Sequence, residues 1–356
     1  MKIVTIIGAR PQFIKAAPVS RALSATGSIR EIIIHTGQHF DENMSNIFFE
    51  QMHIPKPNYN LNIHSLPHGA MTGRMLEDIE KILIEEKPDR VMVYGDTNST
   101  LAGALAASKL HIPVAHVEAG LRSFNMKMPE EINRILTDRI SKQLFCPTQT
   151  ARENLLKEGF EDFNAQFMVT GDVMYDAALM FSEKAVQPEG ISLPDNFLLA
   201  TVHRQENTDN LSSLGNIIES LNHIANHATL VFPVHPRTKK ILESKELPTL
   251  SKNIICTPPL GYLEILWLLK NCQMVITDSG GMQKEAYFFE KPCITLRNET
   301  EWTELVKAGY NKICGNDQAL ITNAFDHFRR NRVIFKPGLY GDGNAATKIA
   351  QALLTN

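Results

Sequence analysis

Short apolar runs rich in β-branched residues alternate along the whole chain with stretches in which apolar positions recur at helical spacing. This alternation is typical of a parallel sheet whose strands are joined by crossover helices, so we predict an α/β fold. Helical spacing is clear at residues 101–110 and 263–269. We expect strands in the first half at 2–7, 31–36, 90–95, 113–118, 143–147 and 167–171, and in the second half at 197–202, 229–234, 253–257, 274–278, 293–296 and 311–315.

The alternation is interrupted once, between about residues 172 and 194, where a helical stretch is followed by the turn-rich sequence "PEGISLPD". The strand pattern restarts at Phe197. A chain of 356 residues is too long for one hydrophobic core and about right for two. We therefore predict two α/β domains, residues 1–171 and 172–339, with a C-terminal helix at about 340–356.

Composition and charge exclude several classes of protein. The net charge of −3 gives no reason to expect nucleic acid or an acidic membrane as a partner. The five cysteines are widely spaced and include no Cys-x-x-Cys pair, which favours reduced thiols over disulfides or a zinc site. The first apolar run is too short for a signal peptide, and no run approaches the ~20 residues of a membrane span. We therefore predict a soluble, cytoplasmic protein without a bound metal.

Polar and ionisable residues follow the expected strands in both halves. Ligands of open parallel sheets bind outside the carboxyl ends of the strands, so this pattern predicts one site at a cleft between two facing domains. The alternative is that these residues are polar only because loops are exposed. The residues concerned are Gly8, Ala9, Arg10, Gly37, Gln38, His39, Gly95, Asp96, Thr97, Glu118, Ala119 and Gly120, then His203, Arg204, His235, Pro236, Arg237, Asp278, Ser279, Gly280, Arg297, Asn298 and Glu299.

Carboxylates gather in the segment "HVEAGLRSFNMKMPEEINR", and a helix is expected where apolar residues recur from Ile132 to Ile140. Glu130 and Glu131 have an ordinary explanation, because Pro-Glu-Glu favours a helix start by ~0.3–1 kcal/mol through the helix dipole. That explanation does not cover Glu118, nor Asp96 at the end of the preceding strand. Grouped carboxylates raise one another's pKa values and can supply a base and an acid near neutral pH.

The segment "ITDSGGMQKEA" predicts a phosphate site. Ser279, Gly280 and Gly281 follow an expected strand and begin a helix, where free N–H groups and the helix dipole attract anions. Glu285, one turn into the helix, is suited to accept hydrogen bonds from a ribose. The alternative is a tight strand–helix turn with a serine that only caps the helix.

Two further strand ends carry cations. In "IIGARPQFIK", Arg10 and Lys15 accompany a helix start that matches neither the dinucleotide fingerprint nor the P-loop, so neither nicotinamide nor ATP is indicated. In "ATVHRQEN", His203 and Arg204 end the first strand of the second half. A single histidine is more often structural than functional, but beside an arginine a phosphate-directed role is an equal alternative.

At these residues the chain resembles the non-hydrolysing UDP-N-acetylglucosamine 2-epimerases over essentially its whole length. The motifs that carry the resemblance are "GARPQFIK", "TGQH", "YGDTNSTLAGALAA", "HVEAGLRS", "MPEEINR", "PVHPR", "TDSGGMQKEA" and "YGDGNAA". The resemblance implies two Rossmann-like domains facing a cleft, the glycosyltransferase-B architecture, with the last helix packed back on the first domain. It also implies a homodimer that needs no cofactor and no metal.

The reaction implied is inversion at C2 of a UDP-2-acetamido sugar. A base removes the C2 proton while UDP leaves C1, and UDP adds again to the bound 2-acetamidoglycal after protonation of its other face. The resemblance implies Asp96, Glu118 and Glu130 as acid and base carboxylates, and His203 as a catalytic group at the phosphates. The implied substrate-binding and UDP-binding residues are Arg10, Lys15, Gln38, His39, Arg122, Arg204, His235, Tyr262, Ser279, Gly280, Gly281 and Glu285.

Some segments resemble a branch that acts on UDP-2,3-diacetamido-2,3-dideoxyglucuronate in bacterial surface-polysaccharide synthesis. They are "SFNMKMPEEINRILTD", "VHRQENTD" and "NETEWTELV". Trp302 stands where the commoner enzymes carry the arginine of Thr-Glu-Arg-Pro-Glu, and Phe40 where they carry the arginine of Gln-His-Arg. We therefore expect the diacetamido uronate as substrate, with UDP-N-acetylglucosamine as the alternative. A UDP-sugar-dependent glycosyltransferase and a non-catalytic UDP-sugar sensor are the alternatives from other classes.

Overall fold

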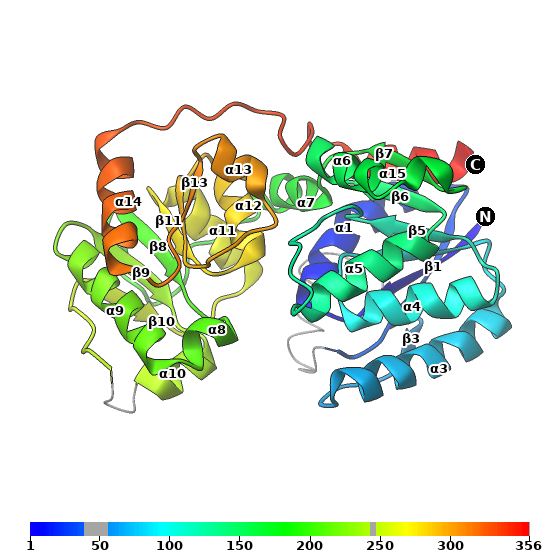
Figure 1. Cartoon of the computed structure of the whole chain (residues 1–356), viewed down its shortest axis with the longest axis horizontal. Helices are drawn as coiled ribbons and strands as arrows, with labels where there is room; N and C mark the ends of the chain where they lie inside the picture. Colours follow the sequence, from blue (N-terminus) through cyan, green and yellow to red (C-terminus); the bar gives the residue numbers. More distant parts are fainter. Residues whose placement is uncertain (39–55, 243–246, 356) are drawn as a thin grey trace. The chain divides into compact units, whose positions relative to one another are not determined.

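The computed structural model describes residues 1–38, 56–242 and 247–355. The chain divides into two compact units, the first formed by Met1–Met180 with Pro337–Asn356 and the second by Phe181–Lys336 (Figure 1). Each unit has its own parallel sheet and its own helices. The α/β fold with two Rossmann-like domains is thus confirmed, whereas the cleft between them stays a prediction.

The division between the units falls inside helix α7 (Val173–Ser182), whereas the sequence places it just ahead of this helix. Hydrogen bonds explain why the start of α7 stays with the first unit. The Asp176 carboxylate accepts from the N–H groups of Ala345 (3.1 Å) and Ala346 (2.7 Å). These are the first residues of α15 (Ala345–Thr355), which lies within the range expected for the C-terminal helix.

The sheet of the first unit has the strand order β3-β2-β1-β4-β5-β6-β7, and all its described strand pairs are parallel. The direction of strand succession reverses between β1 and β4, which is the point where doubly wound folds bind ligands. The strands are β1 (Lys2–Ile7), β2 (Arg30–His35), β3 (Tyr59–Asn60), β4 (Arg90–Tyr94), β5 (Val114–Val117), β6 (Gln143–Cys146) and β7 (Gln166–Val169).

Helices connect these strands and cover the sheet. α15 contacts α1, so the C-terminal segment packs on the first unit. Besides α7 and α15, the helices of this unit are α1 (Arg10–Ala25), α3 (His68–Glu86), α4 (Asn98–Lys109), α5 (Pro129–Ile140), α6 (Gln149–Lys157) and the 3-10 turn η1 (Phe160–Asp162).

One face of the first sheet is covered by α3 and α4, which also contact each other. Met71, Met75 and Ile79 are spaced by one helical turn along α3 and are buried in the core beneath it. α4 lies so close to the sheet that a Cβ at Gly103 would be 2.5 Å from Ile6 Cδ1. Glycine and alanine in α4 therefore bring its backbone near β1 and β4.

The second unit contains a parallel sheet in the order β10-β9-β8-β11-β12-β13, which reverses between β8 and β11. Its strands are β8 (Phe197–Thr201), β9 (Thr229–Pro233), β10 (Ile254–Thr257), β11 (Val275–Thr277), β12 (Cys293–Thr295) and β13 (Asn311–Ile313). Its helices are α8 (Gln205–Thr208), α9 (Leu211–Ala225), α10 (Pro236–Leu242), α11 (Tyr262–Asn271), α12 (Gly280–Phe288), α13 (Thr303–Lys307) and α14 (Gln318–Arg330).

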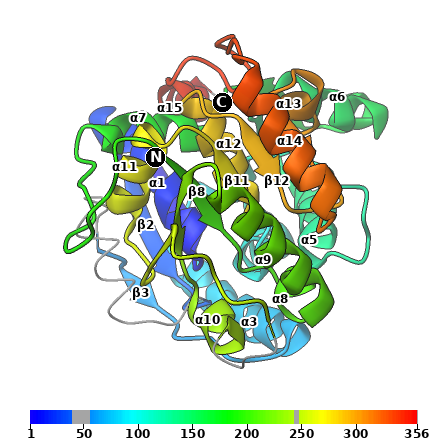
Figure 2. The same cartoon turned by 90° about the vertical axis from the view of Figure 1, so that its left-hand side faces the viewer.

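α9 and α14 lie side by side over this sheet, as Figures 1 and 2 both show. Leu214, Ile217 and Leu221 of α9 recur at helical spacing and are completely buried. They share one core with Ile321 and Phe325 of α14 and with apolar residues of the strands. This packing holds the carboxyl ends of β8 and β11 next to each other.

Each strand expected from the sequence is present, with ends that differ by at most two residues. β3 was not expected, because its two residues are too few to form a recognisable apolar run. The sequence therefore predicted the core strands that position the candidate site, and missed an edge strand.

Candidate active site

A buried ion pair joins Lys15 of α1 to Glu118, which directly follows β5. Their side chains are only 10% and 6% exposed. Gly95, after β4, has φ +63°, and a Cβ there would lie 3.0 Å from Lys15 Nζ and 3.2 Å from Glu118 Oε2. Glycine therefore leaves the space that the ion pair occupies. Lys15, predicted to bind substrate, is in this structure the cation beside Glu118.

Glu118 adopts a left-handed backbone conformation with φ 71°. This conformation costs a non-glycine residue roughly 1–2 kcal/mol, and such strain gathers at functional sites. Two hydrogen bonds stabilise it, because the N–H groups of Glu118 (3.1 Å) and Ala119 (3.0 Å) both donate to the carbonyl of Phe145. The chain thus turns sharply at the strand end and directs the Glu118 carboxylate toward Lys15.

The turn between β1 and α1 is braced by Gln12, which the sequence analysis did not select. Its Oε1 accepts from the N–H groups of Gly8 (2.8 Å) and Ala9 (3.0 Å), and its Nε2 donates to the carbonyl of Tyr94 (2.9 Å). Gln12 therefore ties the ends of β1 and β4 together. Arg10, predicted to contact phosphate, begins α1 and is half-buried.

The predicted helix after the carboxylate cluster is α5, but its apolar residues do not form its buried face. Ile132 and Leu136 are 39% and 46% exposed, whereas Glu131 and Asp138 are 1% and 0% exposed. The reason is that the polar side chains of α5 make hydrogen bonds with the strand-end loops, as the next contacts show. Burial of charge is tolerated when every charge has partners.

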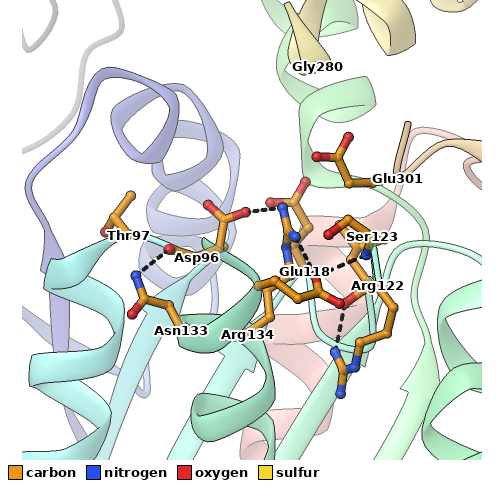
Figure 3. A network of polar contacts seen from close by, with 12 residues as sticks. Asp96, Thr97, Glu118, Arg122, Ser123, Asn133, Arg134, Gly280 and Glu301 are labelled. Carbon is orange, nitrogen blue, oxygen red and sulfur yellow. Dashed lines mark hydrogen bonds and ion pairs between the residues drawn. The ribbon is translucent and has the colours of Figure 1, made fainter. Parts of the chain in front are cut away.

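Arg134 of α5 spans two carboxylates. Its Nη1 lies 2.8 Å from Glu131 Oε2, and its Nη2 lies 2.5 Å from Asp96 Oδ2. The neighbouring Asn133 donates through Nδ2 to the backbone carbonyl of Asp96 (2.9 Å). Figure 3 shows Asp96 held in this way from α5. The position of Asp96 is therefore set by α5 as well as by the end of β4.

Glu131 fixes the loop that precedes α5. Its two oxygens accept from the backbone N–H groups of Ser123 and Phe124, each at 2.9 Å. Burial raises the pKa of Glu131, but these N–H groups and the Arg134 guanidinium together hold that pKa below its ordinary value. Glu131 is therefore ionised at neutral pH. The sequence selected Glu130 instead, which is exposed on the first turn of α5.

A second buried network fixes the loop after β5. Asp138 accepts from the N–H of Gly120 (3.1 Å) and from Arg122 Nη1 (2.8 Å), and its Oδ1 lies 2.7 Å from His116 Nδ1. Burial raises the pKa of Asp138, but His116 and Arg122 hold it below the ordinary value. Arg122 also makes a two-point contact with Glu158 (2.6 and 2.9 Å).

These contacts show that Arg122 braces the loop, and its predicted role in binding substrate stays a prediction. The side chain of Arg122 is 1% exposed, and its guanidinium pairs with two carboxylates. Gln38 is likewise engaged, because its Oε1 accepts from the N–H (3.2 Å) and hydroxyl (2.9 Å) of Ser99. His39 and Phe40, which the sequence analysis singled out, lie outside the described residues.

In the second unit, Asp278 organises the end of β8. This fully buried carboxylate accepts from the backbone N–H groups of His203 (3.0 Å) and Arg204 (2.9 Å) and from Asn207 Nδ2 (3.1 Å). Its Oδ1 also lies 3.2 Å from His203 Nδ1, so Asp278 orients the imidazole. His235 is exposed, with its ring centroid 6.1 Å from that of His203.

The predicted phosphate-binding turn is present at the start of α12. Ser279 is the N-cap of this helix, and its hydroxyl accepts a hydrogen bond from the N–H of Met282 (3.4 Å). A serine that caps the helix was the alternative to a phosphate site in the sequence analysis. Gly281 is exposed, and a Cβ there would have no neighbour within 4 Å. The helix start therefore leaves space at its N–H groups, whereas Glu285, one turn on, is buried.

Trp302, which replaces an arginine of the resembling motif, is buried against this helix start. Its Nε1 donates to the carbonyl of Gly280 (2.9 Å), and the Lys284 ammonium lies 4.1 Å from the centroid of its ring. Nearby, Arg297 and Glu301 form a two-point ion pair (2.9 and 3.3 Å). Trp302 therefore supports α12 and is only 5% exposed, which leaves little of its surface for a ligand.

Tyr262 has a packing role in this structure. It begins α11, is 3% exposed and makes an edge-on contact with Phe181 at 6.0 Å between ring centroids. Its predicted role in binding UDP stays a prediction without support from these contacts. Among the described residues, no group of three or more His, Cys, Asp or Glu side chains is placed to hold a metal ion.

No helix in the described part of the chain is both long and apolar enough to cross a membrane. All five cysteines are free thiols, and Cys256 is the exposed one. The predicted cytoplasmic location stays a prediction.

The two sheets and the chemistry at their strand ends define an α/β enzyme built from two Rossmann-like units. The family model for UDP-N-acetylglucosamine 2-epimerase matches residues 21–354. A relative from Pseudomonas aeruginosa, the UDP-2,3-diacetamido-2,3-dideoxy-D-glucuronate 2-epimerase, is 56% identical over 99% of each chain. The chain belongs to the UDP-N-acetylglucosamine 2-epimerase family, whose members are isomerases.

Solved structures agree with this assignment. The UDP-N-acetylglucosamine 2-epimerase of Methanocaldococcus jannaschii, in complex with UDP-N-acetylglucosamine and UDP, matches with a TM-score of 0.90 at 45% identity over 100% of both chains. The enzyme from Neisseria meningitidis, bound to UDP-N-acetylglucosamine, matches with a TM-score of 0.90 at 32% identity over 100% of both chains.

Proposed function

We propose that this protein inverts C2 of a UDP-2-acetamido sugar without hydrolysing it. The observation that supports this most directly is that Asp96 and Glu118 follow neighbouring strands and each pairs with a cation of its own. Arg134 Nη2 lies 2.5 Å from Asp96 Oδ2 and Lys15 pairs with Glu118, so a cation holds each carboxyl group in place at its strand end. Such a pair suits removal of a proton from one face of a carbon and its return to the other face.

The bond changes balance within the substrate. One carboxylate takes the C2 proton, the electron pair of that C–H bond forms the C1–C2 double bond, and the C1–O bond breaks to release UDP. The second residue, which starts as a carboxylic acid, protonates C2 from the opposite face and becomes a carboxylate, and UDP re-forms its bond to C1. Because the C2 hydrogen is not next to a carbonyl, the enzyme must stabilise the departing diphosphate.

The second unit offers the groups for that task. His203 is oriented by Asp278, and the N–H groups at the start of α12 favour negative charge. We assign His203, Arg204, His235 and Arg10 to the diphosphate and Ser279, Gly280, Gly281 and Glu285 to UDP. A homodimeric assembly, a third catalytic carboxylate at Glu130 and the absence of a required cofactor belong to the same proposal.

The substrate we propose is UDP-2,3-diacetamido-2,3-dideoxyglucuronate, which would give the manno epimer for surface-polysaccharide synthesis. The 56% identity with the Pseudomonas aeruginosa enzyme supports this choice. UDP-N-acetylglucosamine is the alternative. Two relatives named for that substrate, from Methanocaldococcus jannaschii and Methanococcus maripaludis, are each 46% identical to this chain and cover 99% and 97% of it.

The first prediction tests the reaction. When the protein is incubated with either UDP-sugar in D₂O and no acceptor, recovered substrate and product both gain deuterium at C2, because the proton on the carboxylate exchanges with solvent. Proton NMR of the anomeric and C2 positions measures this. Inversion without deuterium uptake contradicts elimination, and consumption of UDP-sugar only after an acceptor is added favours the glycosyltransferase.

The second prediction concerns substrate choice. We expect a higher kcat/KM for the diacetamido uronate than for UDP-N-acetylglucosamine, because a cation can pair with the C6 carboxylate that the latter lacks. Exposed Lys127, in the loop before α5, is the candidate cation. Lys127→Met should then lower kcat/KM for the uronate alone, with Lys142→Met as a surface control. Equal or better use of UDP-N-acetylglucosamine refutes the preference.

A further inference from the structure

Three polar side chains in the first half of α5 hold the groups around Asp96. Asn133 binds the backbone carbonyl of Asp96, Arg134 binds its carboxylate, and Glu131 binds both Arg134 and the loop before the helix. Residues three apart on a helix lie on one side of it, so Glu131 and Arg134 can meet. Figure 3 shows the guanidinium and the Asp96 carboxylate directed toward each other.

The contact between Arg134 and Asp96 is more than the neutralisation of a buried charge. An arginine that paired with Glu131 alone could place both of its terminal nitrogens on that carboxylate. Instead, the fork is divided between Glu131 (2.8 Å) and Asp96 (2.5 Å), whose side chain is 27% exposed at the strand end. The guanidinium is planar and rigid, so it fixes the distance between the two carboxylates.

The loop before α5, which Glu131 binds, contains a residue in an unfavourable backbone conformation. Phe124 has φ 60°, which is unfavourable for a bulky residue, and its side chain is 76% exposed. The Glu131 carboxylate stabilises this conformation by accepting from the N–H of Phe124 (2.9 Å). A change in the conformation of this loop would therefore move Glu131 and, through Arg134, the Asp96 carboxylate.

We propose that Arg134 is a positioning residue for the epimerisation: it fixes the Asp96 carboxylate relative to the Glu131-anchored loop. The inference rests on the proposed function, in which Asp96 transfers a proton at C2. In this proposal Arg134 acts through Asp96, whose carboxylate it contacts at 2.5 Å, and not on the substrate directly. Its contribution is the placement of Asp96, and a displacement of about 1 Å at a reacting group can lower turnover by about 10²-fold.

The third prediction tests this role with a double-mutant cycle. Arg134→Met should lower kcat by about 10²-fold while the KM for the UDP-sugar changes little, because the nucleotide is bound by other residues. In the background of Asp96→Asn, adding Arg134→Met should have no further effect, since the group that Arg134 places is already inactive. Arg134→Lys should recover part of kcat, because it restores the charge but contacts one carboxylate at a time.

A second readout separates positioning from general stability. In D₂O, the glycal either returns to substrate or proceeds to product, so the ratio of deuterium in the two pools reports which carboxylate is impaired. Arg134→Met should shift this ratio in the same direction as Asp96→Asn and opposite to Glu118→Gln. Arg139→Met is the matched control, because Arg139 is an exposed arginine of the same helix whose guanidinium stacks on Phe160 and Phe163.

Two outcomes overturn the inference. One is an equal loss of kcat from Arg134→Met in the wild-type and Asp96→Asn backgrounds. The other is a reduced melting temperature with an unchanged deuterium ratio. If Arg134→Met does not fold, Arg134→Lys carries the same cycle. Failure of the proposed function gives a different result, because the wild-type protein then epimerises neither UDP-sugar.

Discussion

We expect Glu118→Gln and Asp96→Asn each to lower the turnover of epimerisation by at least ~10²-fold, the usual scale for a general acid or base. The amide keeps the shape of the side chain but takes up no proton. Binding of UDP, measured by calorimetry, should remain nearly unchanged, because, apart from Arg10, we assign the nucleotide to groups of the second unit. Glu118→Gln also removes a charge beside Lys15, so Glu118→Asp shows whether charge alone suffices.

Glu153→Gln is the matched control, since Glu153 is an exposed glutamate of α6 in the same unit. It should retain wild-type turnover. Glu130→Gln separates the two explanations of the "PEE" sequence: a loss of ~10²-fold supports a third catalytic carboxylate, and near-normal turnover leaves Glu130 as a helix-start residue. Near-normal turnover of Glu118→Gln would contradict the proposed mechanism.

The sequence predicted the core strands because buried parallel strands consist of nearly continuous apolar residues. It also predicted that ionisable residues would follow these strands, and the structure places Asp96 two residues after β4 and Glu118 directly after the neighbouring strand β5. Both are consequences of local pattern and of the general rule for open sheets. Neither needs knowledge of which distant residues meet.

The sequence did not predict which face of α5 is buried, because that depends on contacts with residues distant along the chain. The apolar spacing of α5 indicated a helix correctly, yet Ile132 and Leu136 are exposed and Glu131 is buried. The polar residues of α5 are inside because their partners come from separate parts of the chain, such as His116 and Gly120 for Asp138. Periodicity records which residues are apolar, and it does not record which charges have found partners.

The dependence on distant partners also explains why the ion pairs of Lys15 and Arg122 were not predicted. Lys15 and Arg122 were predicted to bind substrate because they are cations near strand ends. The structure gives Lys15 a carboxylate partner in Glu118 and gives Arg122 two, Asp138 and Glu158. A cation beside a sheet can meet a ligand, a neighbouring carboxylate or both, and the sequence alone does not show which carboxylates it meets.

Asp138→Asn should destabilise the first unit by about 3–5 kcal/mol, the usual effect of removing one partner from a buried ion pair. Asp138 is 0% exposed and accepts hydrogen bonds from Gly120 and from the Arg122 guanidinium. Asparagine would turn an NH₂ group toward one of these donors and leave the Arg122 charge without its buried partner. Asp162→Asn, at an exposed position of η1, is the control.

The measurement must report on the first unit by itself, because a two-domain chain need not unfold in one step. Both tryptophans, Trp267 and Trp302, belong to the second unit, so their fluorescence serves as the internal reference. Hydrogen exchange of peptides from β5 and α5, followed by mass spectrometry, should show faster exchange in Asp138→Asn. Fluorescence-detected unfolding of the second unit should change little.

The lowered pKa of Asp138 also predicts the direction in which the stability of the first unit changes with pH. The native pKa of Asp138 lies below its ordinary value of 3.8, so its contribution to stability is complete above that pH and is lost as pH falls toward the native pKa. Glu131 acts in the same sense below 4.5. Wild-type exchange in β5 and α5 should therefore accelerate as pH falls below about 4, after correction for intrinsic exchange. Asp138→Asn should reduce that acceleration, because one of the two titrating groups is gone and only Glu131 remains. An equally steep acceleration in the variant would mean that Asp138 does not stabilise the loop through its charge.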